Sequence, residues 1–451
     1  MNDMEVRISD HFTFRKIFRI TIFPILMAIF ASIYGVVDGI CVSNFAGSDA
    51  FSGLNLIYPA TFVIGGLAFM FGSGGSAYVG KMLGEGRKED ANKAFSMTIN
   101  FALLIGVILS VIGFFLVKPI VYAFASIRDD VTIEMINAAI SYGRILMIFQ
   151  FTFIMQFTFQ SFFVIAEKIK VGFMFTLIAG ISNILFDLLF LGVFKMGVIG
   201  AAIGTTLGQL FGGLGSFLYF IIKRDGIIYL TRTKLKRRPL VKIVTNGLSE
   251  LITNISGSLV SLLINAQLLR YVGQDGVFAY GIIMYIQYIF IAIYFGYSTG
   301  MSPPLSYHYG AKNYVEQRNI LVRSMIIIVS AGIIMMTIGF LLNKPLTYIF
   351  ISKGDETLIA LSEKAIRIYS LCYLTMGVSI YMSSFFTALN NGLVSGTISL
   401  FRMLIYQLLF ILITPIIMGG DGIWWGIVFA ELAATITSLI FLFALKKKYQ
   451  Y

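Results

Sequence analysis

The stretch Gly113-Phe-Phe-Leu-Val-Lys-Pro-Ile-Val-Tyr-Ala-Phe124 recurs later in the chain as Gly339-Phe-Leu-Leu-Asn-Lys-Pro-Leu-Thr-Tyr-Ile-Phe350. The two copies lie 226 residues apart and are identical at seven of their twelve positions. The same separation places Gly84 on Gly310. We therefore predict that the chain consists of two halves with the same fold.

The composition is typical of a membrane protein. Of the 451 residues, 58% are hydrophobic and 12% are charged, whereas a soluble domain usually has about 45–50% apolar and about 25% charged residues. This excludes an ordinary cytosolic enzyme, and it excludes a disordered chain, which needs low hydrophobicity and dense charge. Two cysteines and two histidines are too few for a disulfide framework or a histidine-based metal site.

Apolar stretches of about 20 residues, the length that crosses a bilayer, occur twelve times in the sequence. They lie near residues 17–44, 53–80, 93–117, 134–160, 170–194, 198–222, 242–270, 276–305, 317–343, 360–388, 393–418 and 422–445. Because six spans per half is an even number, the two halves insert with the same orientation, as parallel repeats. We predict an all-α polytopic membrane protein with twelve transmembrane helices in two six-helix bundles.

The predicted organisation is an N-terminal bundle at 1–222, a basic linker at 223–241 and a C-terminal bundle at 242–451. Two bundles of this kind imply a cavity between them that is usable for alternating access. A purely structural pseudo-dimer is the alternative. The linker is expected to face lipid headgroups, with a dedicated partner site as its alternative.

The net charge of +12 follows the positive-inside rule. Assigning loops alternately to the two sides places 24 Lys and Arg residues on the side of the termini and six on the other. The six are Lys118, Arg128, Lys195, Arg270, Lys344 and Lys353. Because basic loops stay in the cytoplasm, we predict cytoplasmic termini and a location in the inner (plasma) membrane. The same rule accounts for the basic charge, so we expect the lipid bilayer and no nucleic acid as a partner.

Two carboxylates lie well inside predicted spans of the first half, Asp38 in the first span and Asp187 in the fifth. A charge there costs about 2.5–3.5 kcal/mol on insertion scales, so each needs a partner or a function. Asn183 precedes Asp187 by four residues, on the same helix face, and Thr205 of the sixth span adds a hydroxyl. These four hard oxygen donors suit Na⁺, or a carboxylate pair that holds a proton. A hydrogen-bonded clamp between helices is the alternative.

Other polar residues are candidates for a substrate cleft. We expect Gln150, Gln156 and Gln160 of the fourth span, with Tyr34 of the first, to line a cavity in the first half. Three roles are open for Glu250 in the seventh span. It could attract a cationic ligand from a vestibule, cap a neighbouring Thr or Asn, or extend to the cytoplasmic surface. The 42 Phe, 23 Tyr and 20 Met residues include a subset that would suit bulky, flat cations.

For four further polar residues in the spans, the sequence favours structural roles. Glu431 and Gln209 occupy equivalent positions of the two halves, which favours packing. Arg144 and Arg402 are expected to pair with acids or to extend to the surface.

Nucleotide-binding and metallohydrolase motifs are absent from the sequence. It contains no Gly-x4-Gly-Lys-Ser/Thr and no His-Glu-x-x-His pattern, which excludes ATP hydrolysis by the P-loop route and one common hydrolytic chemistry. We therefore predict that the protein is not an enzyme, needs no cofactor, and draws its energy from an ion gradient.

Together these residues resemble the multidrug and toxic compound extrusion (MATE) family over about residues 12 to 445. The resemblance rests on Pro24, the stretch VDGICVSNFAG at 37–47, Asn183 with Asp187, GVIGAAIGT at 197–205 and GDGIWWG at 420–426. It is nearest the DinF-like prokaryotic branch.

The resemblance implies a cation site in the first bundle, made by Asp38, Asn183, Asp187 and Thr205. It also implies that the first helix bends at Pro24 as Asp38 changes state. The NorM branch carries acids in its seventh and tenth spans. This chain lacks them near Ser258 and at 388–390, which leaves a second-lobe cation site without its ligands.

We therefore expect a monomeric secondary antiporter for multidrug efflux, which exports amphiphilic, often cationic compounds in exchange for Na⁺ or H⁺. A flippase for a lipid-linked saccharide or cell-wall precursor is the alternative, and it would need a cleft rich in Lys and Arg to bind pyrophosphate. A membrane-embedded transferase or hydrolase would need a catalytic constellation, and none is visible in the sequence.

Overall fold

The computed structural model describes residues 6–54, 56–126, 131–351 and 356–451, and these residues are predominantly helical, with no strand among them. The first half forms α1 (Phe14–Phe45), α2 (Ser48–Leu54), α3 (Tyr58–Gly84), α4 (Lys88–Ala125), α5 (Ile133–Ile148), α6 (Gln150–Ile165), α7 (Ile169–Asp187), the π-helical segment η1 (Leu188–Val193) and α8 (Gly197–Ile222). Arg128 and Lys353, two of the six basic residues assigned to the side opposite the termini, lie outside the described residues.

The second half repeats the six spans but divides them differently into helices. It forms α9 (Arg237–Tyr271), α10 (Gln274–Gly310), α11 (Tyr314–Leu341), α12 (Asn343–Phe350), α13 (Glu356–Ser370), α14 (Cys372–Ala388), α15 (Gly392–Leu400), the π-helical segment η2 (Phe401–Ile405), α16 (Tyr406–Met418) and α17 (Asp421–Tyr449). In each half the fifth span contains a π-helical segment.

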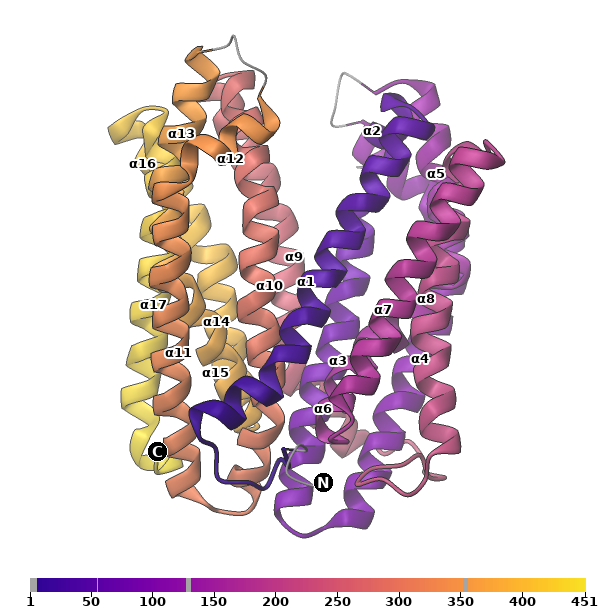
Figure 1. The fold of residues 1–451 in the computed structure, drawn as a ribbon, viewed down its shortest axis with the longest axis vertical. Helices are drawn as coiled ribbons and strands as arrows, with labels where there is room; N and C mark the ends of the chain where they lie inside the picture. The colour runs from indigo at the N-terminus through magenta and orange to yellow at the C-terminus, as the bar shows by residue number, and fades with distance from the viewer. Residues whose placement is uncertain (1–5, 55, 127–130, 352–355) are drawn as a thin grey trace.

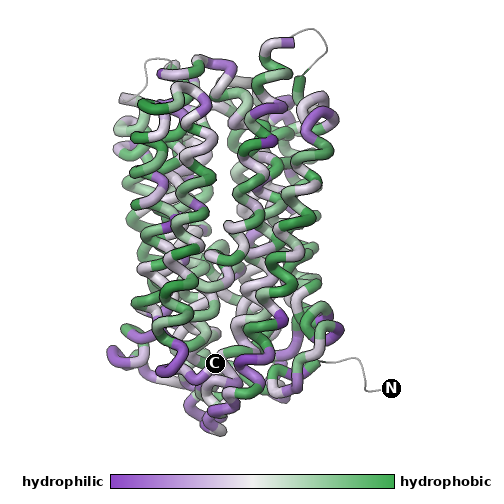
Figure 2. The backbone as a smooth tube through the Cα atoms, turned by 90° about the vertical axis from the view of Figure 1, so that its left-hand side faces the viewer, coloured by the Kyte–Doolittle hydropathy of each residue, from purple (hydrophilic) through white to green (hydrophobic). Residues whose placement is uncertain are grey.

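The number of spans agrees with the prediction. Among the described residues, ten helices are long and apolar enough to cross a bilayer, and two bent pairs bring the number to twelve if each pair is one span. The pairs are α5 with α6, bent by 61°, and α13 with α14, bent by 42°. Both are the fourth span of their half, as an internal repeat requires. Hydrophobic residues dominate the middle of the helices, and hydrophilic residues gather at the two ends (Figure 2).

Each half forms its own lobe, and the two lobes meet near the end of the molecule that carries both termini, here called the terminal end (Figure 1). At the opposite end the lobes diverge. At the terminal end α3 of the first lobe packs against α10 of the second. A Cβ added to Gly84 would collide with the carbonyl oxygen of Tyr307, and one added to Gly310 would collide with that of Lys81. Since each of these contacts is the other shifted by 226 residues, the lobes are related by a pseudo-two-fold axis.

The first helix connects the two lobes. α1 is continuous through Pro24 and runs obliquely between the lobes (Figure 1). At Pro24 it lies so close to α10 that a Cβ added to Gly296 would be 2.6 Å from the Pro24 carbonyl oxygen. Further along, α1 packs against α7 and α8 of the first lobe. Because proline lacks the N–H that would bond to the preceding turn, Pro24 is the weakest point of this helix.

The linker between the lobes docks on the first one. Tyr229 donates its main-chain N–H to Asn92 Oδ1 at 2.9 Å, and Thr231 donates its N–H to Ser96 Oγ at 2.8 Å. Both acceptors belong to α4. The connection between α8 and α9 covers residues 223–236, so the last five residues of the predicted linker belong to α9, which starts at Arg237.

Candidate functional site

The four residues predicted as a cation site lie together in the first lobe. The Thr205 hydroxyl on α8 donates to Oδ1 of Asp38 on α1 at 3.2 Å. On α7, Asn183 donates its side-chain amide to Asp187 Oδ2 at 3.2 Å and to Thr205 Oγ1 at 3.4 Å. A hydrogen-bonded chain therefore links α1, α7 and α8 through side chains distant in sequence.

Burial isolates this cluster from solvent. Asp187 is 0% exposed, Asn183 is 3% exposed and Asp38 is 7% exposed. Glycine on α8 makes room for the carboxylate, because a Cβ on Gly204 would collide with Asp187 Oδ1. The π-helical segment η1 begins directly after Asp187, and such segments often occur at functional sites because they displace the helix backbone locally.

The cluster contains more acceptors than donors. Asp187 Oδ1 and Asn183 Oδ1 are buried and have no hydrogen-bond partner. Within the described parts of the chain, no basic side chain forms an ion pair with Asp38 or Asp187. Unsatisfied buried acceptors cost about 1–3 kcal/mol each, and a bound cation or proton removes that cost.

The donor set fits a small hard cation or a proton. It consists of two carboxylates, one amide oxygen and one hydroxyl, all of them hard oxygen donors. No group of three or more His, Cys, Asp or Glu residues that could hold a metal ion occurs in the described part of the chain. The cluster therefore lacks the nitrogen and sulfur ligands that transition metals prefer.

A second feature is the cavity between the lobes, which has a volume of about 340 Å³. Small-molecule sites typically measure about 300–1,000 Å³. The Phe69 ring contacts Phe157 at a centroid distance of 5.0 Å and Phe295 of the second lobe at 4.9 Å, both edge to face. All three rings line the cavity, as do Phe62 and Tyr288. These cavity-lining aromatic residues cannot be recognised from the sequence, because they are a small subset of many Phe residues, most of which face lipid or the packed interior.

The predicted cleft residues divide between this cavity and the lobe interior. Gln160 and Glu250 line the cavity, whereas Tyr34, Gln150 and Gln156 are not among its lining residues. Gln150 and Gln156 are buried within the first lobe. Gln156 packs on Gly212 of α8, and Tyr34 packs on Gly180 of α7.

The Glu250 carboxylate does not accept a hydrogen bond from the neighbouring Thr or Asn side chain. Thr253 donates to the main-chain oxygen of Ser249, and Asn254 donates to the main-chain oxygen of Glu250 itself. The carboxylate has no hydrogen-bond or ion-pair partner in the part of the chain that the structure describes. It is therefore available to a ligand in the cavity.

The two arginines inside spans have different environments. Arg402 on η2 donates its Nε–H to Glu431 Oε2 on α17 at 2.9 Å, as expected of a paired charge. Arg144 lies over the Phe114 ring at 5.5 Å from its centroid. Its Nε is buried without a hydrogen-bond partner.

Two helical lobes, a cavity between them and a buried acid cluster in one lobe are typical of a membrane transporter. The MatE family model matches residues 24–189 and 251–413. The chain therefore belongs to the MatE family of multidrug and toxic compound extrusion transporters. This confirms the resemblance inferred from the sequence.

Individual relatives span nearly the whole chain. The multidrug export protein MepA of Staphylococcus saprophyticus is 22% identical over 418 residues, which is 92% of this chain and 90% of that protein. MepA of Staphylococcus aureus strain NCTC 8325 is 21% identical over 422 residues, again 92% and 90%. A multidrug resistance MATE family transporter solved in an outward-facing conformation superposes with a TM-score of 0.89 at 21% identity, with 98% of both chains covered. The structural superposition shows that the two chains share a fold.

Proposed function

We propose that the protein is a secondary antiporter that exports amphiphilic, often cationic compounds in exchange for inward Na⁺ or H⁺. It would act as a monomer in the inner (plasma) membrane, with both termini in the cytoplasm. The observation that carries the proposal is the hydrogen-bonded cluster of Asp38, Asn183, Asp187 and Thr205, whose buried acceptors have no permanent cation. A transported ion would supply the missing positive charge.

The position of Asp38 on α1 offers a way to couple the ion to the cavity. The same helix carries Pro24, which packs on α10 of the second lobe. A change of charge at Asp38 would therefore act on a helix that contacts both lobes. Linkage requires that ion and drug weaken each other's binding if each favours a different state of this helix.

The chemistry of the cavity favours flat cations. Its aromatic rings attract a cation through their faces, and Glu250 supplies a carboxylate without a partner of its own. The relatives named multidrug export proteins support drug-like compounds as substrates.

A flippase for pyrophosphate-linked lipids is the weaker candidate. Pyrophosphate needs several cations for tight binding. Arg402 is the one Lys or Arg residue among the described residues that line the cavity, and a single guanidinium does not supply several cations. We therefore favour export of cations.

The test uses the purified protein in proteoliposomes. Ethidium efflux is measured once under an imposed sodium gradient and once under an imposed pH gradient, and one of them is expected to drive transport. Asp38→Asn should abolish gradient-driven efflux, while Asp225→Asn in the exposed linker serves as the control. Full efflux by Asp38→Asn would overturn the assignment of the coupling site.

A further inference from the structure

The second lobe presents three ionisable side chains to the cavity. They are Glu250 on α9, Arg402 on η2 and Glu431 on α17. The distance between Arg402 Nε and Glu431 Oε2 is 2.9 Å. The π-helical segment η2 packs against both α9 and α17. When ionised, the three groups carry one net negative charge, so the second lobe's wall of the cavity still attracts cations.

The Arg402 guanidinium is only partly used by this pair. It has five N–H donors, and Glu431 takes the one on Nε. Arg402 is 7% exposed, and neither of its two terminal amino groups has a hydrogen-bond partner in the described chain. These two groups form the end-on edge that binds a carboxylate with two parallel hydrogen bonds.

We propose that the second lobe's wall of the cavity is a subsite for zwitterionic substrates. The Arg402 amino groups bind the substrate's carboxylate, and Glu250 binds its cationic group. The proposal rests on the proposed export function and specifies part of its substrate class. Glu431 is a positioning residue, because its bond to Nε fixes the plane of the guanidinium. Monocations would use Glu250 alone.

Two dyes that differ in a single group test the subsite. Rhodamine 110 carries a free carboxylate beside its delocalised cation, and rhodamine 123 is its methyl ester and therefore a monocation. Gradient-driven efflux of each dye gives its kcat/KM in proteoliposomes. The variant is Arg402→Gln with Glu431→Gln, because Gln209 occupies the position equivalent to Glu431 in the first lobe.

We expect the ratio of kcat/KM for rhodamine 110 to that for rhodamine 123 to fall about tenfold, which is typical of one charge-assisted hydrogen bond. Arg402→Lys keeps the charge but loses the end-on edge, so it should lower the same ratio, which guards against a folding defect of the double variant. Glu250→Gln should lower kcat/KM for both dyes, because both carry the cation.

An unchanged ratio in both Arg402 variants would overturn the subsite. Transport of rhodamine 123 but not of rhodamine 110 by the wild type would also overturn it and would leave the proposed export function intact. Failure of the wild type to transport either dye would overturn the export of cations itself.

An independent observation concerns the segment that precedes α1. Its residues 6–13 bond to both lobes at the terminal end. The N–H of Ile8 donates to Glu167 Oε1, in the connection between α6 and α7 of the first lobe, at 2.7 Å. The N–H of Phe12 donates to Glu316 Oε1, on α11 of the second lobe, at 2.8 Å. Ile8 and Phe12 are both buried.

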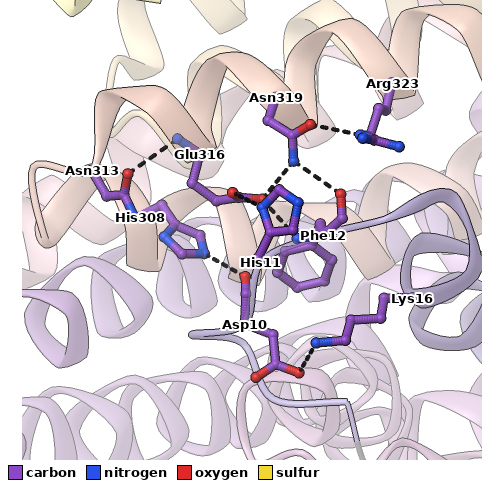
Figure 3. A network of polar contacts seen from close by, with 9 residues as sticks. All are labelled: Asp10, His11, Phe12, Lys16, His308, Asn313, Glu316, Asn319 and Arg323. Atoms are coloured by element: carbon purple, nitrogen blue, oxygen red, sulfur yellow. Dashed lines mark hydrogen bonds and ion pairs between the residues drawn. The ribbon is translucent and has the colours of Figure 1, made fainter.

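Several further bonds hold this segment on the second lobe (Figure 3). Asn319 donates to the Phe12 carbonyl oxygen at 2.9 Å, and His11 Nδ1 lies 2.6 Å from Glu316 Oε2. His308 Nε2 bonds to the Asp10 carbonyl oxygen at 3.2 Å.

The geometry points to residues 6–13 as a clasp that holds the two lobes together at the terminal end. Its bonds to both lobes can form at once only while the lobes are adjacent there, so they stabilise this state relative to one that is open at the terminal end. This inference also rests on alternating access. It makes the N-terminal segment a determinant of the balance between the two states.

Spin labels report that balance directly. Labels at Lys88→Cys and Ala311→Cys, both exposed near the terminal end, are placed in a chain in which Cys41 and Cys372 are replaced by Ser or Ala. Distances are measured by electron–electron double resonance in proteoliposomes. Glu316→Ala should increase the long-distance population several-fold, because it removes the acceptor for Phe12 and His11.

Asn319→Ala, which removes one bond to the N-terminal segment and leaves Glu316 in place, should shift the distances in the same direction by less. Glu89→Ala is the control. It removes an exposed ion pair with Lys93 and should leave the distance distribution unchanged. Unchanged distance distributions in both Glu316→Ala and Asn319→Ala would overturn the clasp. Export of ethidium by these variants tests the proposed function separately.

Discussion

The Thr205 hydroxyl donates to Asp38 Oδ1 at 3.2 Å, and this bond ties the sixth span to the first. The same hydroxyl accepts from Asn183, which in turn bonds to Asp187. Thr205 is therefore the link between two carboxylates on different helices.

Thr205→Ala should weaken ion coupling without unfolding the protein. Loss of one ligand oxygen and of one hydrogen bond to a carboxylate is expected to raise the ion concentration for half-maximal efflux about tenfold. Thr206→Ala is the matched control, because the Thr206 hydroxyl bonds to the Ala202 carbonyl oxygen instead. Equal effects of both substitutions on dye efflux would contradict the role given to Thr205.

Gly204→Ala should disable the cluster more severely. Its Cβ would collide with Asp187 Oδ1, and overpacking of this kind typically costs about 1–3 kcal/mol. We expect a lower Tm in detergent and loss of gradient-driven efflux. Gly35→Ala on α1, where a Cβ has no neighbour within 4 Å, should keep both near wild type. A fully active Gly204→Ala would show that the carboxylate has room to move aside.

Glu431→Gln alone should be strongly destabilising. It leaves the buried Arg402 without its counter-charge, and breaking a buried ion pair from one side typically costs about 3–5 kcal/mol. Adding Arg402→Gln should restore much of the lost stability, because both charges are then absent. Thermal unfolding of the two single variants and the double variant gives the coupling energy. Additive effects would mean that the pair contributes nothing as a pair.

Gly310→Leu should separate the lobes at the terminal end. Its side chain would collide with the carbonyl oxygen of Lys81 on α3, so we expect a larger fraction of molecules open at that end, measured by the spin-label distances described above. Gly281→Leu on the same helix, at a position with no neighbour within 4 Å, is the control. A similar distance distribution for both variants would argue against close contact of α3 and α10.

The sequence was sufficient for the spans and the repeat because these depend on local properties. The apolar length of each span and the 226-residue repeat are read directly from residue types, and the structure agrees with both. The grouping of Asp38 with Asp187 could also be anticipated, because both lie at similar depth in spans of one bundle and Asn183 shares a face with Asp187. The inclusion of Thr205 could not be derived from the sequence pattern alone, since nothing local fixes the face of α8 that it occupies.

The cavity lining could not be read in the same way. A helix in a bilayer is apolar toward lipid and toward its neighbours alike, so the pattern of hydrophobic residues does not mark its inner face. For this reason the sequence does not show that Gln160 lines the cavity between the lobes while Gln150 and Gln156, on the same helix, are buried within the first lobe.

Residue order and hydrophobicity by themselves determined that the chain crosses the membrane about twelve times as two equal halves, because insertion responds to local polarity. Only the tertiary structure decided which acid accepts from Arg402, and that residues 6–13 bond to both lobes. These contacts depend on helix rotation and on the approach of segments 304 residues apart, and such approaches are set by packing between helices rather than by any local signal.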